Sequence, residues 1–360
     1  MLLFLCGATA ACGPVSAVET DTRRLLMEGL GNEVWVPTYV EFEDRMDDLK
    51  SALKTLCKEP DEEALEAAQA AWWAARAPWK RNELLGFGPA VDLELRAQTN
   101  IDFWPARPST IDAVLAGDDE LNEATVSELG ASSRGLPVLE YLLYSGEGSV
   151  EDRFAPDGQR CAYAKGLAAD TKTQATALRK AWDPEFGDYL SNLVSAGRSG
   201  KDVEFRSIDL ALSEVVSRLA FTIENIRGDK LGNVLGTRSG GTPQPDSAES
   251  RFSSRSLEDI RDNVRGVELV LVGKKKTSES LSVYLESLGH KELRSELRAA
   301  LDASYESLDA ITPPLTSAVI DDPEAVQAAI DTLRELQTLI QVDVINALGL
   351  TLTFNDTDGD

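Results

Sequence analysis

Residues 208–226 read IDLALSEVVSRLAFTIENI, and the spacing of the apolar side chains in this stretch decides the class of fold. The apolar positions recur every three or four residues, at Ile208, Leu212, Val215, Leu219, Ile223 and Ile226. This period places them on one face of an α-helix. The same spacing recurs at Met46, Leu49, Leu53 and Leu56, and no stretch alternates at period two for more than a few residues. The sequence therefore predicts an all-α protein.

Breaks between the helical patterns organise the rest of the chain. A long helix is predicted to begin near Thr20, bend at Pro37 and end before Pro60, and Asp61 is expected to cap the next helix, which runs toward Gly86. Further helices are predicted near residues 111, 122 and 135, and over 159–182, 184–196, 255–272, 277–288, 290–307 and 323–347. Irregular segments are predicted over 86–90, 101–110 and 228–248. Because GRSGK at 197–201 is the best linker, we expect two packed helical bundles, over residues 24–198 and 199–360.

The charge balance of the chain disfavours several classes of partner. The 360 residues include 36 Lys and Arg against 61 Asp and Glu, a formal charge of −25. Phosphate-rich polymers and anionic lipid surfaces bind basic protein surfaces, so we expect no nucleic-acid partner and no electrostatic membrane docking. The single histidine, His290, cannot supply a zinc site that needs two or three imidazole ligands.

The first residues are typical of an export signal. Residues 2–12 read LLFLCGATAAC, an apolar run that is too short to span a bilayer but fits the core of a secretory signal. Two cleavage patterns compete: one leaves a lipid-modified Cys12, and the other removes residues 1–17. Both predict a protein of the bacterial periplasm or cell envelope. Contact with a membrane would then occur only through an N-terminal lipid.

Two cysteines remain after either cleavage, Cys57 and Cys161. A pair of cysteines in an oxidising compartment predicts a disulfide, and the alternative is two buried free thiols.

Polar residues at the aromatic-rich breaks are the candidates for a functional site. They fall into groups at residues 76–83, 100–107, 134–140, 225–230 and 249–256. The residues singled out as ligand-binding are Arg76, Trp79, Glu83, Asp102, Trp104, Arg107, Arg134, Gly135, Glu140, Glu249, Arg251 and Ser254. Each group has a structural alternative: a solvated face of ion pairs, a polar helix end, or a helix cap at Ser254 or Ser256. Glu140 lies among apolar residues and needs a partner, for which Arg134 is the nearest candidate in the sequence.

These motifs, in this order, resemble the imelysin family of exported bacterial proteins. The matching pieces are W-x2-AR-x-PW at 72–79, IDFWP at 101–105, RGLPVLEYLLY at 134–144, RGDKLG at 227–232, ES-x-FSS-x-S at 249–256 and LGLTLTFNDTDGD at 348–360. The resemblance implies two packed helical bundles with a site in the crevice between them, an exported location and a link to iron uptake. Founding members of the family were described as peptidases. The family motif is G-x-H-x-x-E, and here Gly135 and Glu140 match it while Pro137 replaces the histidine.

Three functional hypotheses follow, and none of them assigns a catalytic residue. The first is a non-catalytic binding protein for iron, in which Glu140, Glu83, Asp102 and Glu249 are candidate ligands because hard cations prefer carboxylate oxygens. Arginines 76, 107 and 134 instead suit an anionic iron chelate, so bare ion and chelate both stay open. The second is a scaffold that docks another envelope protein, such as a redox or transport partner. The third is a metallopeptidase, which lacks the motif histidine. Convergence of these residue groups at one site is a separate prediction, and the scaffold would instead be marked by an exposed apolar patch.

Overall fold

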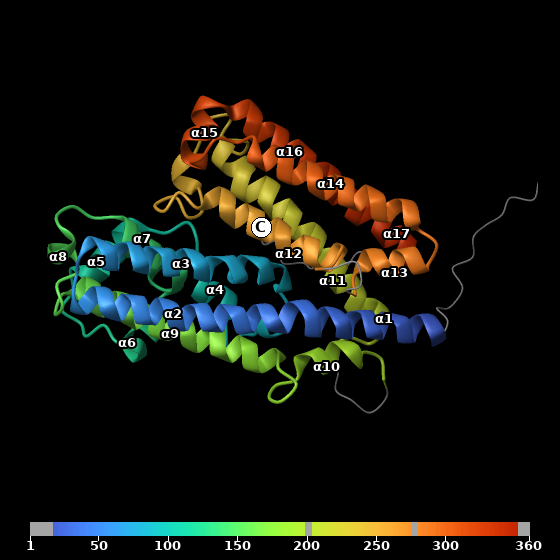
Figure 1. The fold of residues 1–360 in the computed structure, drawn as a ribbon, viewed down its shortest axis with the longest axis horizontal. Helices are drawn as coiled ribbons and strands as arrows, with labels where there is room; N and C mark the ends of the chain where they lie inside the picture. The colour runs from blue at the N-terminus through green and yellow to red at the C-terminus, as the bar shows by residue number, and fades with distance from the viewer. Residues whose placement is uncertain (1–16, 199–203, 275–278, 352–360) are drawn as a thin grey trace, which may run out of the picture.

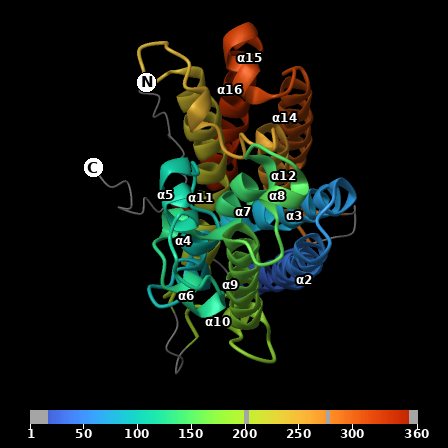
Figure 2. The same ribbon diagram turned by 90° about the vertical axis from the view of Figure 1, so that its left-hand side faces the viewer.

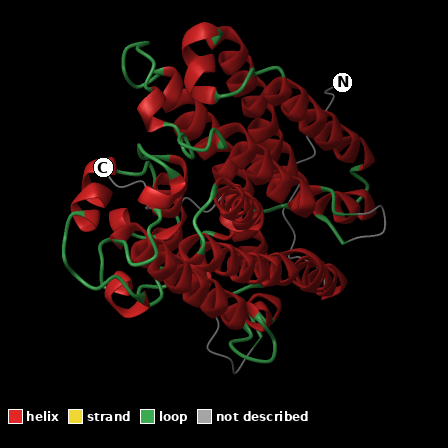
Figure 3. Ribbon diagram, turned by 60° about the vertical axis from the view of Figure 1, so that its left-hand side comes forward, coloured by secondary structure: helices red, strands yellow, loops and turns green. Residues whose placement is uncertain are grey.

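The computed structural model describes residues 17–198, 204–274 and 279–351, and within these ranges it is helical and contains no β-strand (Figures 1 and 3). The predicted all-α class is confirmed. Helices from the first 200 residues form one layer and those after residue 208 form the other (Figures 1 and 2). The helices of the described ranges do not combine the length and apolar character that crossing a membrane requires.

The first layer is built on a long rod and two helices packed against it. The rod consists of α1 (Ala17–Leu30), a π-helical turn η1 (Gly31–Trp35) and α2 (Val36–Lys58). Pro37 lies in the first turn of α2, where its missing N–H costs little. The predicted cap of α3 (Glu62–Asn82) is confirmed, because the side chain of Asp61 accepts a hydrogen bond from the Ala64 N–H. Both α3 and α9 (Gln159–Trp182) pack along α2.

Short elements connect these helices. They are the 3-10 turns η2 (Glu83–Leu85), η3 (Gly88–Ala90) and η4 (Ala131–Ser133), with α4 (Ala97–Ile101), α5 (Pro108–Leu115), α6 (Glu123–Ser127), α7 (Gly135–Tyr144), α8 (Val150–Arg153) and α10 (Tyr189–Val194). The helix predicted over 184–196 is shorter than expected. Asp188 adopts a left-handed conformation (φ 50°), which keeps the chain out of a helix until Tyr189.

The second layer begins with the stretch that decided the class of fold. It comprises α11 (Ile208–Asn225), the π-helix η5 (Ile226–Asn233), the 3-10 turn η6 (Pro245–Ser247), α12 (Ser256–Leu271), α13 (Leu281–Ser287), α14 (Lys291–Asp309), α15 (Leu315–Asp321), α16 (Pro323–Thr338), the π-helix η7 (Leu339–Val344) and α17 (Ile345–Leu348). The loop predicted over 228–248 starts later than expected, because the backbone stays helical through η5. Helix α12 lies against α3 and joins the two layers (Figures 1 and 2).

The apolar core is continuous between the layers. Leu49 and Leu53 of α2 and Leu212 and Val215 of α11 are fully buried, and all belong to one connected cluster of buried side chains. The division into bundles over 24–198 and 199–360 stays a prediction. Much of its linker, and the predicted signal segment with Cys12, lie outside the described residues.

The predicted disulfide between Cys57 and Cys161 is confirmed. Its Cα atoms lie 5.6 Å apart, and it joins the end of α2 to the first turn of α9 across 104 residues. Closing a loop of this length restricts the unfolded chain, which stabilises the fold by about 4 to 5 kcal/mol in the chain-entropy model.

Replacing both cysteines, Cys57→Ser with Cys161→Ser, should therefore lower the free energy of unfolding by about 4 to 5 kcal/mol. Urea unfolding followed by circular dichroism measures this change. The reduced wild-type protein serves as a matched control and should unfold at the same urea concentration as the double variant. Equal stability of the oxidised wild type and the variant would contradict the expected role of the bridge.

Candidate functional site

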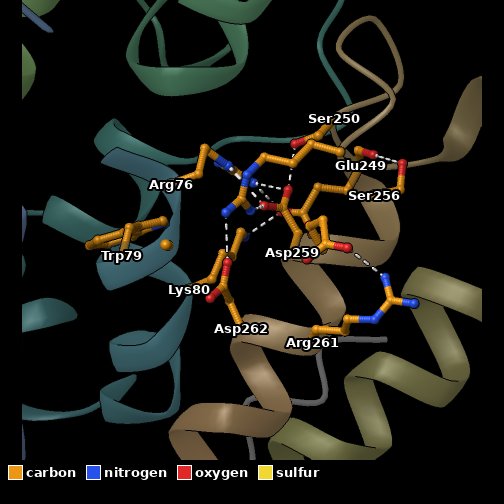
Figure 4. A network of polar contacts seen from close by, with 12 residues as sticks. Arg76, Trp79, Lys80, Glu249, Ser250, Ser256, Asp259, Arg261 and Asp262 are labelled. Carbon is orange, nitrogen blue, oxygen red and sulfur yellow. Dashed lines mark hydrogen bonds and ion pairs between the residues drawn. The ribbon is translucent and has the colours of Figure 1, made fainter. Parts of the chain in front are cut away.

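Arg76 of α3 is the centre of a group of buried charges between the two layers. Its guanidinium donates to Asp102 (Nη1 to Oδ1, 2.6 Å), to Glu249 (Nη2 to Oε1, 2.9 Å) and to Asp259 (Nη2 to Oδ2, 2.7 Å). The side chain is only 1% exposed, and its three partners come from three different segments of the chain. In Figure 4, the side chains of Arg76 and Lys80 extend toward Glu249 and Asp259. The α3 sequence places both cations on one face, because they are four residues apart.

Lys80 lies one turn further along α3 and is completely buried. Its ammonium group contacts Asp102 Oδ2 (2.5 Å), Glu83 Oε2 (3.0 Å) and an oxygen of Glu249. The indole N–H of Trp79 donates to the same Asp102 oxygen at 2.7 Å. Three carboxylates from separate segments therefore converge on one ammonium group.

Lys230 enters the same cluster from the π-helix η5. Its ammonium group lies 2.9 Å from Glu83 Oε2, 3.0 Å from Glu249 Oε2 and 2.7 Å from Asn263 Oδ1. The wider turns of a π-helix shift the direction of side chains relative to an α-helix, and such segments are frequent at functional sites. The ring of Trp104 lies 5.7 Å from the Lys230 nitrogen and covers this cation.

Helix α12 supplies the remaining charges. Arg255 pairs with Asp259 one turn later, and Asp259 also accepts from the Ser250 hydroxyl. We call the following eight side chains the buried ion-pair network: Arg76, Lys80, Glu83, Asp102, Lys230, Glu249, Arg255 and Asp259. Four are basic and four are acidic, and a further carboxylate, Asp262, pairs with Arg255 at 2.6 Å from the edge of the network.

Glu249 and Asp259 stay ionised because their partners outweigh the cost of burial. Burial alone would raise the pKa of Glu249, but Lys230, Lys80 and Arg76 hold that pKa well below its usual range. Burial likewise opposes the ionisation of Asp259, and its arginine partners lower its pKa. The carboxylates in turn raise the pKa of Lys80 against the effect of its burial.

This arrangement bears directly on the four carboxylates considered as metal ligands. Glu83, Asp102 and Glu249 do converge, but they converge on the Lys80 ammonium group. This ammonium group occupies the position that a metal ion shared by the three carboxylates would take. Throughout 17–198, 204–274 and 279–351, no group of three or more His, Cys, Asp and Glu side chains is arranged to hold a metal ion. Four hollows of about 390 to 740 Å³ border other parts of the chain, and no network residue lines any of them.

Glu140 of α7 lies outside the network and is held by a different partner. One of its oxygens accepts from the Ser253 N–H (2.8 Å) and from the Ser253 hydroxyl (2.7 Å), which joins α7 to the turn before α12. The side chain is 2% exposed, and burial outweighs these hydrogen bonds and raises its pKa to about 7. Pro137, where the family motif has histidine, occupies the first turn of the same helix.

The expected Arg134–Glu140 pair does not form. Arg134 stands at the N-cap of α7, and its guanidinium donates to both oxygens of Asp170 in α9, at 3.0 and 2.6 Å. Gly135 follows with a φ of +80°, and a β carbon at this position would lie 2.2 Å from the Ile101 carbonyl oxygen. A residue with a side chain would therefore displace the backbone just before Asp102.

The remaining predicted residues are less buried than the network. Arg107 is exposed and lies over the Phe103 ring at 5.1 Å, while Arg251 lies over the Phe252 ring at 4.6 Å. Ser254 is exposed in a left-handed conformation (φ 61°) and does not cap α12. The expected cap at Ser256 also does not form, because its hydroxyl donates to the Glu249 carbonyl instead.

Sequence reasoning missed Ser253, Asp259 and Asn263 as site residues. Asn263 donates to Glu83 Oε2 (2.7 Å) and to the Lys80 carbonyl (2.8 Å), so it fixes α12 against α3. A signal was available in the sequence: Asp259 and Asn263 are polar residues on the apolar face of α12. Polar side chains at such positions usually have a specific buried partner.

Comparison with known proteins gives close agreement in fold and length. The family model described as Imelysin matches residues 35–340. "Iron-regulated protein A" of Synechococcus elongatus is 28% identical over 347 residues, covering 92% of this chain and 90% of that protein. Two crystal structures are 18% identical with a TM-score of 0.78: a candidate iron-regulated protein A precursor from Parabacteroides distasonis (95% of this chain, 98% of that one) and an imelysin-like protein from Psychrobacter arcticum (93% and 98%). The two structures bear on the fold alone.

The raised pKa of Glu140 predicts a specific pH dependence of stability. Glu140 binds its proton more tightly in the folded chain (pKa about 7) than at its ordinary value of 4.5. Its stabilising contribution is therefore complete below pH 4.5 and is lost as the pH rises through 7. Glu140→Gln stays neutral and keeps an oxygen to accept from Ser253. Relative to wild type, its free energy of unfolding should rise by roughly 3 kcal/mol between pH 4.5 and about pH 8.

Urea unfolding at a series of pH values measures this difference. The amide group of Gln can add a constant offset, which leaves the slope with pH unaffected. Glu151→Gln, at an exposed position of α8, is the matched control and should show no such slope. A wild-type-minus-variant difference that is flat with pH would contradict the assignment.

Removing one cation from the buried ion-pair network should lower the free energy of unfolding. Lys80→Met leaves Asp102, Glu83 and Glu249 with fewer compensating charges in the interior. Breaking a buried ion pair in this way typically destabilises a protein by about 3 to 5 kcal/mol. Lys58→Met is the matched control, because Lys58 pairs with Glu59 on the surface and should change the urea midpoint little. Equal effects of the two substitutions would mean that the network adds nothing to stability.

Proposed function

This chain belongs to the imelysin family, and from that premise we propose that it is an exported, non-catalytic binding protein that takes up an iron chelate at the boundary between its two helical layers. The relative from Synechococcus elongatus is named an iron-regulated protein, which supports the connection with iron. The ligand would lie against the partly exposed residues beside the buried ion-pair network.

The position of the Lys80 ammonium group favours a chelate over a bare iron ion, and this observation carries the proposal. A bare Fe³⁺ would need several free carboxylate oxygens. Glu83, Asp102 and Glu249 are the carboxylates that converge, and each already contacts Lys80. A cation that replaced Lys80 would have to displace a buried ammonium group from three ion pairs.

The partly exposed edge of the site, which we call the rim, carries two arginine side chains, Arg107 and Arg251. Arg107 forms no ion pair within the described chain, and the nearest carboxylate oxygen to Arg251 belongs to Asp246, 4.0 Å away on a fully exposed side chain. Both guanidinium groups lie on aromatic rings, at Phe103 and Phe252. Guanidinium groups held in this way are suited to the carboxylates of an anionic chelate.

The proposed location is the periplasm or cell envelope. The apolar run at residues 2–12 fits an export signal, ending either in a lipid-modified Cys12 or in cleavage after Ala17. The Cys57–Cys161 disulfide supports an oxidising compartment.

A binding role is favoured over a peptidase role. Proline at position 137 supplies neither a metal ligand nor a general base, and the buried carboxylates are occupied by resident cations. Glu140 accepts hydrogen bonds from Ser253, and within the described residues it belongs to no group of three or more His, Cys, Asp and Glu side chains arranged to hold a metal ion.

Calorimetric titration of the mature chain tests the proposal. Ferric citrate should bind saturably, whereas Fe²⁺, Ca²⁺ and Zn²⁺ should not. The Arg107→Gln/Arg251→Gln double variant should bind ferric citrate at least tenfold more weakly, since a charge-assisted hydrogen bond contributes about 1.5 to 3 kcal/mol. Arg45→Gln, which removes one exposed surface charge, is the control and should bind normally.

Two outcomes would redirect the interpretation. Binding of Fe²⁺ without citrate, lost in Glu140→Gln, would favour a bare ion and contradict the chelate. Absence of binding for every probe would contradict the carrier role and leave docking of another envelope protein as the remaining hypothesis.

A further inference from the structure

The outer side of the second layer carries a groove between α14 and α16, away from the buried ion-pair network. Helix α16 packs alongside α14 on the side of this layer that faces away from the first (Figures 1 and 2). Both helices turn large apolar side chains inward: Leu297 and Leu301 of α14, and Leu333 and Leu336 of α16, are fully buried. The groove lies along a side of the two helices that the core does not use.

Two hollows that lie end to end form this groove. The larger, of about 740 Å³, has Ala299, Ala300 and Ala303 of α14 on one side and Leu339 on the other. The smaller, of about 420 Å³, continues it toward α17, and Glu296 borders both. The alanines and Leu339 are exposed or half-buried, so the floor of the groove presents apolar side chains to solvent.

The walls of the groove are acidic. The charged side chains that border the two hollows are those of Glu292, Glu296, Asp331, Arg334, Glu335 and Asp343. Arg334 pairs with Asp331 at 2.7 Å, and the other four carboxylates form no ion pair within 17–198, 204–274 and 279–351. Arg294 and Arg298 of α14 do not compensate them, because they pair with carboxylates of α13 and α12. An apolar floor thus lies between walls with an excess of negative charge.

We propose that this groove is a docking site for an amphipathic helix of another protein, with small apolar side chains on one face and Lys or Arg on both flanks. A third helix packs into the groove between two others, and alanines let it approach closely. Residues 292–303 of α14 border the groove over about 17 Å, or about three helical turns. Cations on the two flanks of the docked helix would face Glu296 on α14 and Glu335 on α16.

The same charges disfavour a second copy of this chain as the occupant. A copy would bring its own acidic groove, and the whole chain carries a formal charge of −25. The groove shares no residue with the buried ion-pair network or its rim. The proposal therefore does not depend on the binding of an iron chelate.

A labelled peptide tests the site on the mature chain by fluorescence anisotropy. The probe is a helical peptide of about 14 residues with Leu and Ala on one face and Lys on both flanks. It should bind saturably, and more weakly as the salt concentration rises. Glu296→Lys/Glu335→Lys should weaken binding at least tenfold. The matched control is Glu66→Lys/Glu128→Lys, which changes the net charge equally at exposed positions of the first layer and should bind like the wild type.

Two further readouts separate the groove from general attraction to an acidic protein. Ala299→Gln fills the floor at an exposed position without changing the charge, and it should also weaken binding at least tenfold. In NMR spectra of the wild type, the Ala303 methyl signal should shift when the peptide is added, and the methyl signal of Ala67, exposed on α3, should not.

Several results would overturn the proposal. These are the absence of saturable binding, equal weakening by the two charge-reversal pairs, and undiminished binding by Ala299→Gln. A peptide with Glu in place of every Lys that binds equally well would contradict the role of the acidic walls. Self-association of the wild type in sedimentation velocity, lost in Ala299→Gln, would assign the groove to a second copy of this chain instead.

Discussion

The arrangement of the two layers depends on the buried ion-pair network, whose eight charged side chains come from separate segments of both layers. A single charge moved into a protein interior costs several kcal/mol, and its partners offset that cost only at close range. Arg76 illustrates the consequence, because it needs Asp102, Glu249 and Asp259, which lie on three separate segments. The relative positions of α3, the loop after α4 and the start of α12 are therefore set by one requirement. Apolar packing holds the layers together, and the charges select which residues face each other.

Local backbone features bring these side chains into place. Gly135 lets α7 begin directly against the carbonyl of Ile101, the residue before Asp102, and so holds the loop that carries this carboxylate. Ser250 follows Glu249 in a left-handed conformation (φ 47°) and uses its hydroxyl to hold Asp259. The π-helix η5 carries Lys230 to the opposite side of Glu249 from Arg76 and Lys80, on the second carboxylate oxygen. Each of these backbone features restricts the chain locally and fixes the position of one charged side chain.

Sequence periodicity predicted the helices well because the apolar face of a helix is set by the spacing of residues a few positions apart in the sequence. The spacing of Arg76, Lys80 and Glu83 likewise placed three network members on one face. Their partners on other segments could not be predicted from spacing, since these contacts span from 22 to 183 residues. Nearness in sequence was misleading for Arg134, which stands at the start of α7 and turns toward Asp170 on α9 instead of toward Glu140. Helix caps were also misleading at Ser256, whose hydroxyl is used to hold the Glu249 backbone.

The replacement of the motif histidine by Pro137 is consistent with the rest of the site. Without an imidazole nearby, Glu140 has no cation among its hydrogen-bond partners and relies on Ser253, and its burial raises its pKa to about 7. The network beside it forms its ion pairs without Glu140, so this carboxyl group can gain or lose a proton without leaving another charge unpaired. The buried carboxylates already contact resident cations, so a cation that entered this interior would have to displace one of them. On the function proposed above, recognition of an anionic ligand falls instead to Arg107 and Arg251 at the rim.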